Sequence, residues 1–335
     1  MDNPILIETT RGGVVESRHR GSLVVVDTQG DIRLSLGDMQ RPVFPRSAMK
    51  ALQAVASFET GAIEKFNLSK EEIAIACASH GGEVAHTTVA EGILNKAGLG
   101  RNDLECGTHW PSYETAAHEL ARSGAEPCAL HNNCSGKHAN MLASAVCQGL
   151  ETSSYISPEH DVQRRVRSVV ESFCGIDLSQ APMGIDGCSV PNWAVPLDKL
   201  AYGFARFGTG EGCEPERAKL CRQIRSAVAE FPFMVAGTGR FCTRVMEQLG
   251  EKAFVKTGAE GVFCASLPEL GLGIALKIDD GASRASEVVL AHLLQKLGVV
   301  SADKFVRELE PFMLNRNKIK TGVLKAATAL DDLAI

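Results

Sequence analysis

Short apolar runs near both ends of the chain predict β-strands. The segments 23–26 and 32–36 are rich in Val, Ile and Leu and flank the turn sequence Gln29-Gly30-Asp31, which predicts a β-hairpin. The C-terminal third carries further runs of the same kind, at 253–256, 262–266 and 273–278. Strands are therefore expected at both ends.

Between these strands the apolar residues follow the period of a helix. The first helical pattern runs from Ser47 to about Gly61. Others lie at 84–97, 115–123, 137–148, 158–173, 198–207, 214–230 and 241–249, and two follow the last strands at 283–296 and 302–309. Ser157-Pro158 predicts a helix start, whereas the short apolar run 73–78 fits either a buried strand or a helix.

This order of elements predicts an α+β fold. Strands from the N- and C-terminal parts would share one antiparallel sheet, with the helices forming a subdomain of their own. No internal repeat or flexible linker interrupts the chain. We expect a single domain over residues 1–335, with a mainly helical middle portion at about 84–250.

Composition narrows the class of protein. The 335 residues are 44% hydrophobic and 22% charged, as in a soluble globular protein. The net charge of −5 and the scattered Lys and Arg residues argue against a nucleic-acid partner. No segment approaches the ~20 apolar residues of a membrane span, and the N-terminus lacks a signal-peptide pattern. These features predict a cytoplasmic protein with no membrane partner.

The eleven cysteines are dispersed and odd in number, without a Cys-x-x-Cys pair. A disulfide framework is not expected from such a pattern, and most of these residues should be small buried hydrophobic side chains. Cys134 and Cys188 differ because they lie among Gly, Asn and charged residues.

Ser47 and Lys50 are three residues apart, so on a helix they share one face. A buried lysine with a lowered pKa can take the proton of a serine hydroxyl and make it a nucleophile. The spacing alone is weak, because Ser301 and Lys304 repeat it, and a helix cap with a surface lysine is the simpler interpretation.

Two later motifs extend this pattern. Ser79-His80-Gly81-Gly82 follows a buried run, and Lys256-Thr257-Gly258 lies beside a predicted strand. The order matches the nucleophile, second-serine and Lys-Thr-Gly motifs of β-lactamases and penicillin-binding proteins. Ser79-His80-Gly81 lacks the asparagine expected there, and Lys320-Thr321-Gly322 repeats the third motif. A tight turn is the alternative for the paired glycines.

Cys134 and Cys188 supply candidate metal ligands. Cys134 lies in the polar string 131–140, and Cys188 lies close to Asp186. Two thiolates, one nitrogen and an open position would suit a catalytic zinc ion, with His131 or His138 as the nitrogen ligand on chemistry alone. Two unligated buried thiols are the alternative.

Together these motifs resemble the Rhizobium etli-type L-asparaginases. The strings that carry the resemblance are Arg46-Ser47-x-x-Lys50, Ser79-His80-Gly81-Gly82-Glu83, His131-Asn132-Asn133-Cys134-Ser135-Gly136-Lys137-His138, Gly184-Ile185-Asp186-Gly187-Cys188 and Gly237-Thr238-Gly239-Arg240. The resemblance covers about residues 8–325. It implies a fold similar to serine β-lactamases and glutaminases, a homodimer, and hydrolysis of L-asparagine to L-aspartate and ammonia.

The resemblance also implies a set of site residues. Two Ser-Lys tandems are expected, Ser47 with Lys50 and Ser79 with a later lysine, for which we choose Lys256 and keep Lys277 as the second choice. A zinc ion would be held by Cys134, Lys137 and Cys188, which replaces the histidine preferred on chemistry alone. The expected substrate-binding residues are Arg46, His80, Asp186 and Arg240, with a structural ion pair as the alternative for Arg240.

We therefore expect an L-asparaginase in which Ser47, activated by Lys50, forms an acyl-enzyme with the substrate. A glutaminase differs by one methylene in its substrate and is the nearest alternative. A β-lactamase or D,D-peptidase would use the same nucleophile motif on material outside the cytoplasm. A non-catalytic protein stabilised by zinc is the alternative from another class.

Overall fold

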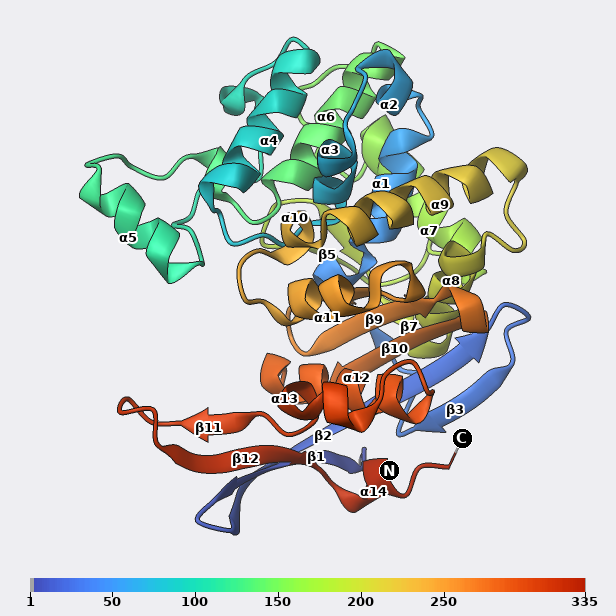
Figure 1. Ribbon diagram of the computed structural model, residues 1–335. Helices are drawn as coiled ribbons and strands as arrows, with labels where there is room; N and C mark the ends of the chain where they lie inside the picture. Colours follow the sequence, from blue (N-terminus) through green and yellow to red (C-terminus); the bar gives the residue numbers. More distant parts are fainter. Residues whose placement is uncertain (1–2, 335) are drawn as a thin grey trace.

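The computed structural model describes residues 3–334 and is built on one antiparallel sheet of eight strands (Figure 1). The strand order is β11-β12-β1-β2-β10-β9-β8, and β3 also pairs with β2. The strands are β1 (Ile5–Arg11), β2 (Val14–Asp27), β3 (Ile32–Leu36), β8 (Phe254–Thr257), β9 (Val262–Leu267), β10 (Leu272–Ile278), β11 (Phe312–Leu314) and β12 (Lys320–Ala326). Strands from the two ends of the chain thus share one sheet, as predicted, with β1 and β2 lying between C-terminal strands on either side.

Two long helices cover the sheet. α8 (Leu197–Thr209) packs on β2, β9 and β10, and α12 (Ser283–Lys296) packs on β1, β9, β10 and β12. Figure 1 shows α12 in front of the sheet and α8 behind it. All six residues of β9 are buried, because both faces of this strand are covered.

The remaining helices form a separate layer above the sheet in Figure 1. They are α1 (Lys50–Phe58), α2 (Ala62–Lys65), α3 (Lys70–Ala74), α4 (Val84–Lys96), α5 (Glu114–Arg122), α6 (Ser135–Gln148), α7 (Asp161–Cys174), α9 (Pro215–Glu230), α10 (Pro232–Ala236) and α11 (Phe241–Leu249). The 3₁₀ helices η1 (Arg46–Met49) and η2 (Ile75–Cys77) belong to this layer, and α13 (Val306–Leu309) and α14 (Thr328–Asp331) lie near the sheet. The predicted α+β architecture with a helical subdomain is confirmed, and this subdomain also includes α1 to α3.

Several boundaries differ from the sequence-based prediction. The helix predicted from Ser157-Pro158 begins at Asp161, where the His160 ring accepts a hydrogen bond from the Val162 backbone N–H. The ambiguous run 73–78 is helical, as the end of α3 followed by η2. The helix predicted at 302–309 is broken into a 3₁₀ turn and α13.

Helix α1 brings the first motif into the centre of the molecule. All nine of its residues are buried, and it packs against α6, α7 and α9. Such a helix has no solvent-facing side, so Lys50 at its first position enters the core together with the apolar residues. Within residues 3–334, no helix combines the length and the apolar character needed to cross a membrane.

Candidate active site

Ser79 lies between two buried lysines. Its Oγ is 2.9 Å from Lys50 Nζ and 2.9 Å from Lys256 Nζ. Both lysine side chains are 1% exposed. Two amines on one hydroxyl allow one amine to donate a hydrogen bond to Ser79 and the other to accept its proton.

Three separate elements bring these groups together. Lys50 opens α1, Ser79 follows η2, and Lys256 lies on β8. Gly258 permits the approach of β8 to η1, because a Cβ at this position would come within 2.6 Å of the Pro45 carbonyl oxygen. The close backbone contact therefore fixes Ser47, on η1, relative to Lys256.

Burial and, to a smaller extent, the positive charge of Lys50 lower the pKa of Lys256 to about 7. An amine with this pKa is partly neutral near pH 7, where an ordinary lysine remains protonated. Lys256 is thus suited to accept the Ser79 proton.

Ser47 is half-buried on η1. Among residues 3–334, the hydrogen bonds of Lys50 Nζ go to Ser79, to the Ala78 carbonyl oxygen and to Cys134, and none goes to Ser47. The preceding Arg46 has a φ of 52°, in the left-handed region that residues with a Cβ rarely adopt. Strained backbone of this kind is frequent at functional sites.

The Arg46 side chain pairs with Asp186 and fixes the loop that carries Cys188. Arg46 Nη2 is 2.8 Å from Asp186 Oδ1, and Arg46 Nε is 2.9 Å from the same oxygen. Burial opposes ionisation of Asp186, but the hydrogen bond and charge of Arg46 outweigh it and lower the pKa of Asp186. Both residues are thus engaged with each other next to Ser47.

The predicted metal ligands lie behind Ser79. Lys50 Nζ is 3.0 Å from Cys134 Sγ, and Lys137 Nζ is 3.1 Å from Cys188 Sγ. A hydrogen bond from Cys188 lowers the pKa of Cys134, with further lowering by the nearby lysines, and the same bond raises the pKa of Cys188. A buried polar chain thus runs from Lys256 through Ser79 and Lys50 to the two thiols.

This donor set fits a zinc ion. Cys134, Lys137 and Cys188 are all buried and approach one another, and two thiolates with one nitrogen are ligands that zinc accepts. Burial disfavours the charge on Lys137, yet the charges of Cys188 and Cys134 outweigh burial and raise the pKa of Lys137. Within residues 3–334, no group of three or more His, Cys, Asp or Glu side chains is arranged to hold a metal ion.

His80 occupies a different place from the other predicted substrate-binding residues. It is fully buried, with Nε2 3.0 Å from Ser135 Oγ and Nδ1 accepting a hydrogen bond from the Gly82 backbone N–H at 3.2 Å. Burial holds the pKa of His80 well below its usual range, and the ring stacks on His86. The structure thus places a neutral His80 behind the Ser79 loop, where it supports that loop.

The alternative lysine and the repeated motifs lie away from the cluster formed by Lys50, Ser79 and Lys256. Lys277, our second choice, donates to the carbonyl oxygens of Glu260 and Ile278 instead of Ser79. Lys320, from the second Lys-Thr-Gly, lies over the Phe312 ring at 3.7 Å from its centroid. Ser301 precedes the exposed turn Ala302–Lys304. Of the two lysines considered, Lys256 is the one that contacts Ser79.

A carboxylate that sequence reasoning passed over holds two of the motifs together. Glu83 accepts hydrogen bonds from the Thr238 backbone N–H at 2.9 Å and from Thr238 Oγ1 at 2.6 Å. Glu83 lies in one of the motifs that carry the family resemblance. The sequence does not indicate its role, because its partner Thr238 lies 155 residues away. The sequence feature that could have pointed to Glu83 is its position directly after the paired glycines Gly81 and Gly82.

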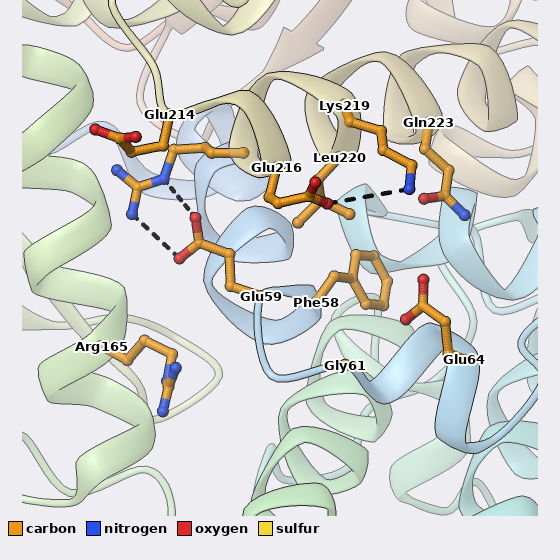
Figure 2. Close-up of a pocket in the computed structure, with 11 residues that line it drawn as sticks. Phe58, Glu59, Gly61, Glu64, Arg165, Glu214, Glu216, Lys219, Leu220 and Gln223 are labelled. Carbon is orange, nitrogen blue, oxygen red and sulfur yellow. Dashed lines mark hydrogen bonds and ion pairs between the residues drawn. The ribbon is translucent and has the colours of Figure 1, made fainter.

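A wide cleft elsewhere does not contain the predicted site. It has a volume of about 630 Å³ and lies between α1, α7 and α9 (Figure 2). Two ion pairs lie along it, Arg217 with Glu59 and Lys219 with Glu216, which the dashed lines of Figure 2 mark. None of the predicted catalytic, metal or substrate-binding residues lines this cleft.

Two buried lysine amines on one serine hydroxyl can activate that hydroxyl, which is the chemistry of hydrolytic enzymes with a serine nucleophile. Comparison with protein families identifies the family: the model described as L-asparaginase II matches residues 7–326. The chain belongs to the L-asparaginase II family, and it is an amidohydrolase. No curated protein sequence matches it significantly.

Similar solved structures share little sequence with the chain. Mglu in its native form is 13% identical, with a TM-score of 0.49, and the alignment covers 84% of this chain and 65% of Mglu. A β-lactamase from Mycobacterium bovis is 13% identical, with a TM-score of 0.41 and coverage of 84% and 95%. Simvastatin synthase from Aspergillus terreus, in a mutant form, is 12% identical, with a TM-score of 0.38 and coverage of 77% and 86%.

Proposed function

We propose that this protein is an L-asparaginase that hydrolyses the side-chain amide of L-asparagine through an acyl-enzyme on Ser47. The observation that carries the proposal is the Ser79 hydroxyl held between Lys50 and Lys256, directly beside η1. Membership of the L-asparaginase II family supports the choice of substrate.

In this mechanism Ser79 relays a proton. Ser47 Oγ attacks the carbonyl carbon of the side-chain amide while its proton passes through Ser79 to the neutral amine of Lys256. The tetrahedral intermediate then collapses, and the nitrogen leaves as ammonia with that proton. Water attacks the resulting ester, and the same two residues return the proton to Ser47 as aspartate leaves.

The proposal includes a zinc ion held by Cys134, Lys137 and Cys188. When bound, zinc would supply a fixed positive charge that orients the substrate near Ser47. Lys137 must lose its proton to bind the metal, so binding is coupled to proton release. Asp186, paired with Arg46, would position the Cys188 loop beside the ion.

Replacing Ser47 with Ala tests the nucleophile. Because the attacking oxygen is lost, Ser47→Ala should lower kcat for ammonia release from asparagine by at least about a thousandfold. Glutamine and a chromogenic β-lactam, assayed in parallel, report which amide is preferred. Ser301→Ala is the matched control, since it removes the serine with the same spacing to a lysine. A folded Ser47→Ala enzyme with unchanged turnover would overturn the serine mechanism.

Removing one thiol tests the metal site. Cys188→Ser should reduce the zinc content of the purified protein from stoichiometric to a small fraction, because one of three protein ligands is lost. Elemental analysis after dialysis against a weak chelator measures this loss. Cys213→Ser removes a half-buried thiol outside the site and should leave the zinc content unchanged. Equal metal content in the two variants would contradict the assignment.

The homodimer stays a prediction of the family resemblance, and the cytoplasmic location stays a prediction of the sequence pattern. Sedimentation of the purified protein measures the first of them. A monomer with full asparaginase activity would contradict that prediction without affecting the proposed chemistry.

A further inference from the structure

A small cavity lies beside the Ser79 loop. Its volume is about 60 Å³, and the residues that line it are Gly81, Glu83, Ser112, Tyr113, Ala236, Thr238 and Arg240. Gly81 is two residues from Ser79, a distance of at most ~7 Å along the chain. Arg240 directly precedes α11, which packs against β8, the strand that carries Lys256.

The Glu83 carboxylate has a fixed position in the cavity wall. In addition to its bonds with Thr238, it fits against Gly237, which has a φ of 102°. A Cβ on Gly237 would come within 2.5 Å of Glu83 Oε1, so the glycine leaves space for the carboxylate. The Glu83 side chain is only 14% exposed.

Within residues 3–334, Glu83 forms no ion pair with a lysine or arginine. Its basic neighbour is His86, whose Nδ1 is 4.0 Å from Glu83 Oε1. Burial lowers the pKa of His86, so this ring is neutral at neutral pH. A mostly buried carboxylate without a counter-charge is costly for the folded state, and a cation from a ligand would offset that cost.

Arg240 is a positive charge without an anionic partner among the described residues. It is exposed, and within residues 3–334 it makes no ion pair, whereas the neighbouring Arg244 pairs with Glu308. Arg240 and Glu83 line the same cavity. The cavity therefore presents one unpaired charge of each sign.

We infer that this cavity binds the zwitterionic end of an α-amino acid, with Glu83 holding the α-ammonium group and Arg240 the α-carboxylate. The inference rests on the proposed function and extends it, because it assigns Glu83 a role in recognising the substrate. A cavity of this size admits the two charged groups and their shared carbon, and the remaining side chain extends toward Ser79. Tyr113, whose backbone N–H donates to the Gly81 carbonyl oxygen at 3.1 Å, closes the cavity on the side of α5.

Calorimetry with three small ligands tests each charge separately. L-Aspartate carries both charged groups, succinate lacks the α-ammonium group, and β-alanine lacks the α-carboxylate. Glu83→Gln keeps the shape and can still bond Thr238, so it removes little besides the charge. It should weaken aspartate binding by about 10- to 100-fold and leave succinate binding nearly unchanged. Arg240→Gln should weaken the binding of aspartate and of succinate but leave the binding of β-alanine unchanged.

Two further variants separate recognition from structural support. Thr238→Val removes one hydrogen bond to Glu83 without removing the charge. It should therefore weaken the binding of aspartate far less than Glu83→Gln does. Glu119→Gln removes an exposed carboxylate on α5, outside the cavity, and should change nothing.

An equal loss of aspartate and succinate binding in Glu83→Gln would overturn the inference, as would a wild-type protein that does not distinguish these ligands. Binding is measured without turnover, so this result is separate from the proposed function. An enzyme that released no ammonia from asparagine but bound aspartate as described would refute the asparaginase proposal alone.

Discussion

Lys256→Met is expected to lower kcat for asparagine hydrolysis by about a hundredfold to ten-thousandfold, the range for loss of a general base. The methionine fills a similar volume but accepts no proton. Lys256→Arg should fail as well, because a guanidinium group stays protonated. The wild-type kcat/KM should rise with pH and level off above about 7, where the Lys256 amine is neutral. Steady-state ammonia release between pH 5 and 9 measures this profile.

The same substitution should stabilise the protein. The pKa of Lys256 falls from an ordinary 10.5 to about 7 on folding, so between these values the unfolded chain binds more protons than the folded one. The free energy of unfolding therefore decreases as the pH falls from 10.5 to 7. At pH 7 the shifted pKa of Lys256 lowers it by up to about 5 kcal/mol. Lys256→Met removes that cost but also loses the bond to Ser79. A net gain of about 1–3 kcal/mol in urea denaturation is expected at pH 7, narrowing at pH 9.

Lys277→Met is the matched control for both measurements. Lys277 lies on β10 and donates only to backbone carbonyl oxygens among residues 3–334. Its loss should leave the pH profile unchanged. Near-wild-type turnover by Lys256→Met would contradict the role of Lys256, and loss of turnover by Lys277→Met would transfer that role to Lys277.

Gly258→Ala should impair catalysis through the backbone. The added methyl group would meet the Pro45 carbonyl oxygen at 2.6 Å and the Ala48 backbone nitrogen at 3.1 Å, so β8 and η1 must move apart. Overpacking of this kind costs about 1–3 kcal/mol of stability. A displacement of Ser47 from Lys256 by about 1 Å is enough to reduce kcat about a hundredfold.

Gly100→Ala provides the control for Gly258→Ala. A Cβ at Gly100 meets no atom within 4 Å, and its φ of −135° suits any residue. This variant should match the wild type in turnover and in thermal unfolding. If Gly258→Ala behaved in the same way, the close approach of β8 to η1 would not be what positions the serine.

The strands that sequence predicted well are those with continuous apolar runs. The segments 262–266 and 273–278 match β9 and β10 closely because both strands are buried. β11 and β12 were not predicted. β11 has only three residues, and β12 is mostly half-buried and mixes two lysines with apolar side chains. For strands without a continuous buried run, pairing decides the structure, and a single sequence does not show which strand is the partner.

The candidate site shows the same limit at the level of side chains. Spacing suggested Ser47 as the partner of Lys50, yet the hydrogen bond goes to Ser79, 29 residues later in the chain. The fold also decides between Lys256 and Lys277, because Lys256 on β8 reaches Ser79, whereas Lys277 on β10 donates to backbone carbonyl oxygens. Residue types were thus predictable from motifs, whereas their contacts depended on how α1, η2 and β8 pack.

The sheet topology has a consequence for synthesis on the ribosome. β2 pairs with β10 through Val25 and Ile274, and β1 pairs with β12 through Ile7 and Ala326. β1 and β2 can pair with each other early, but they lack their partners β12 and β10 until almost the whole chain has been translated. Such non-local pairing slows folding and exposes strand edges in the meantime. We expect the nascent chain to depend on chaperones, and the catalytic groups to assemble only once β8 to β10 have emerged.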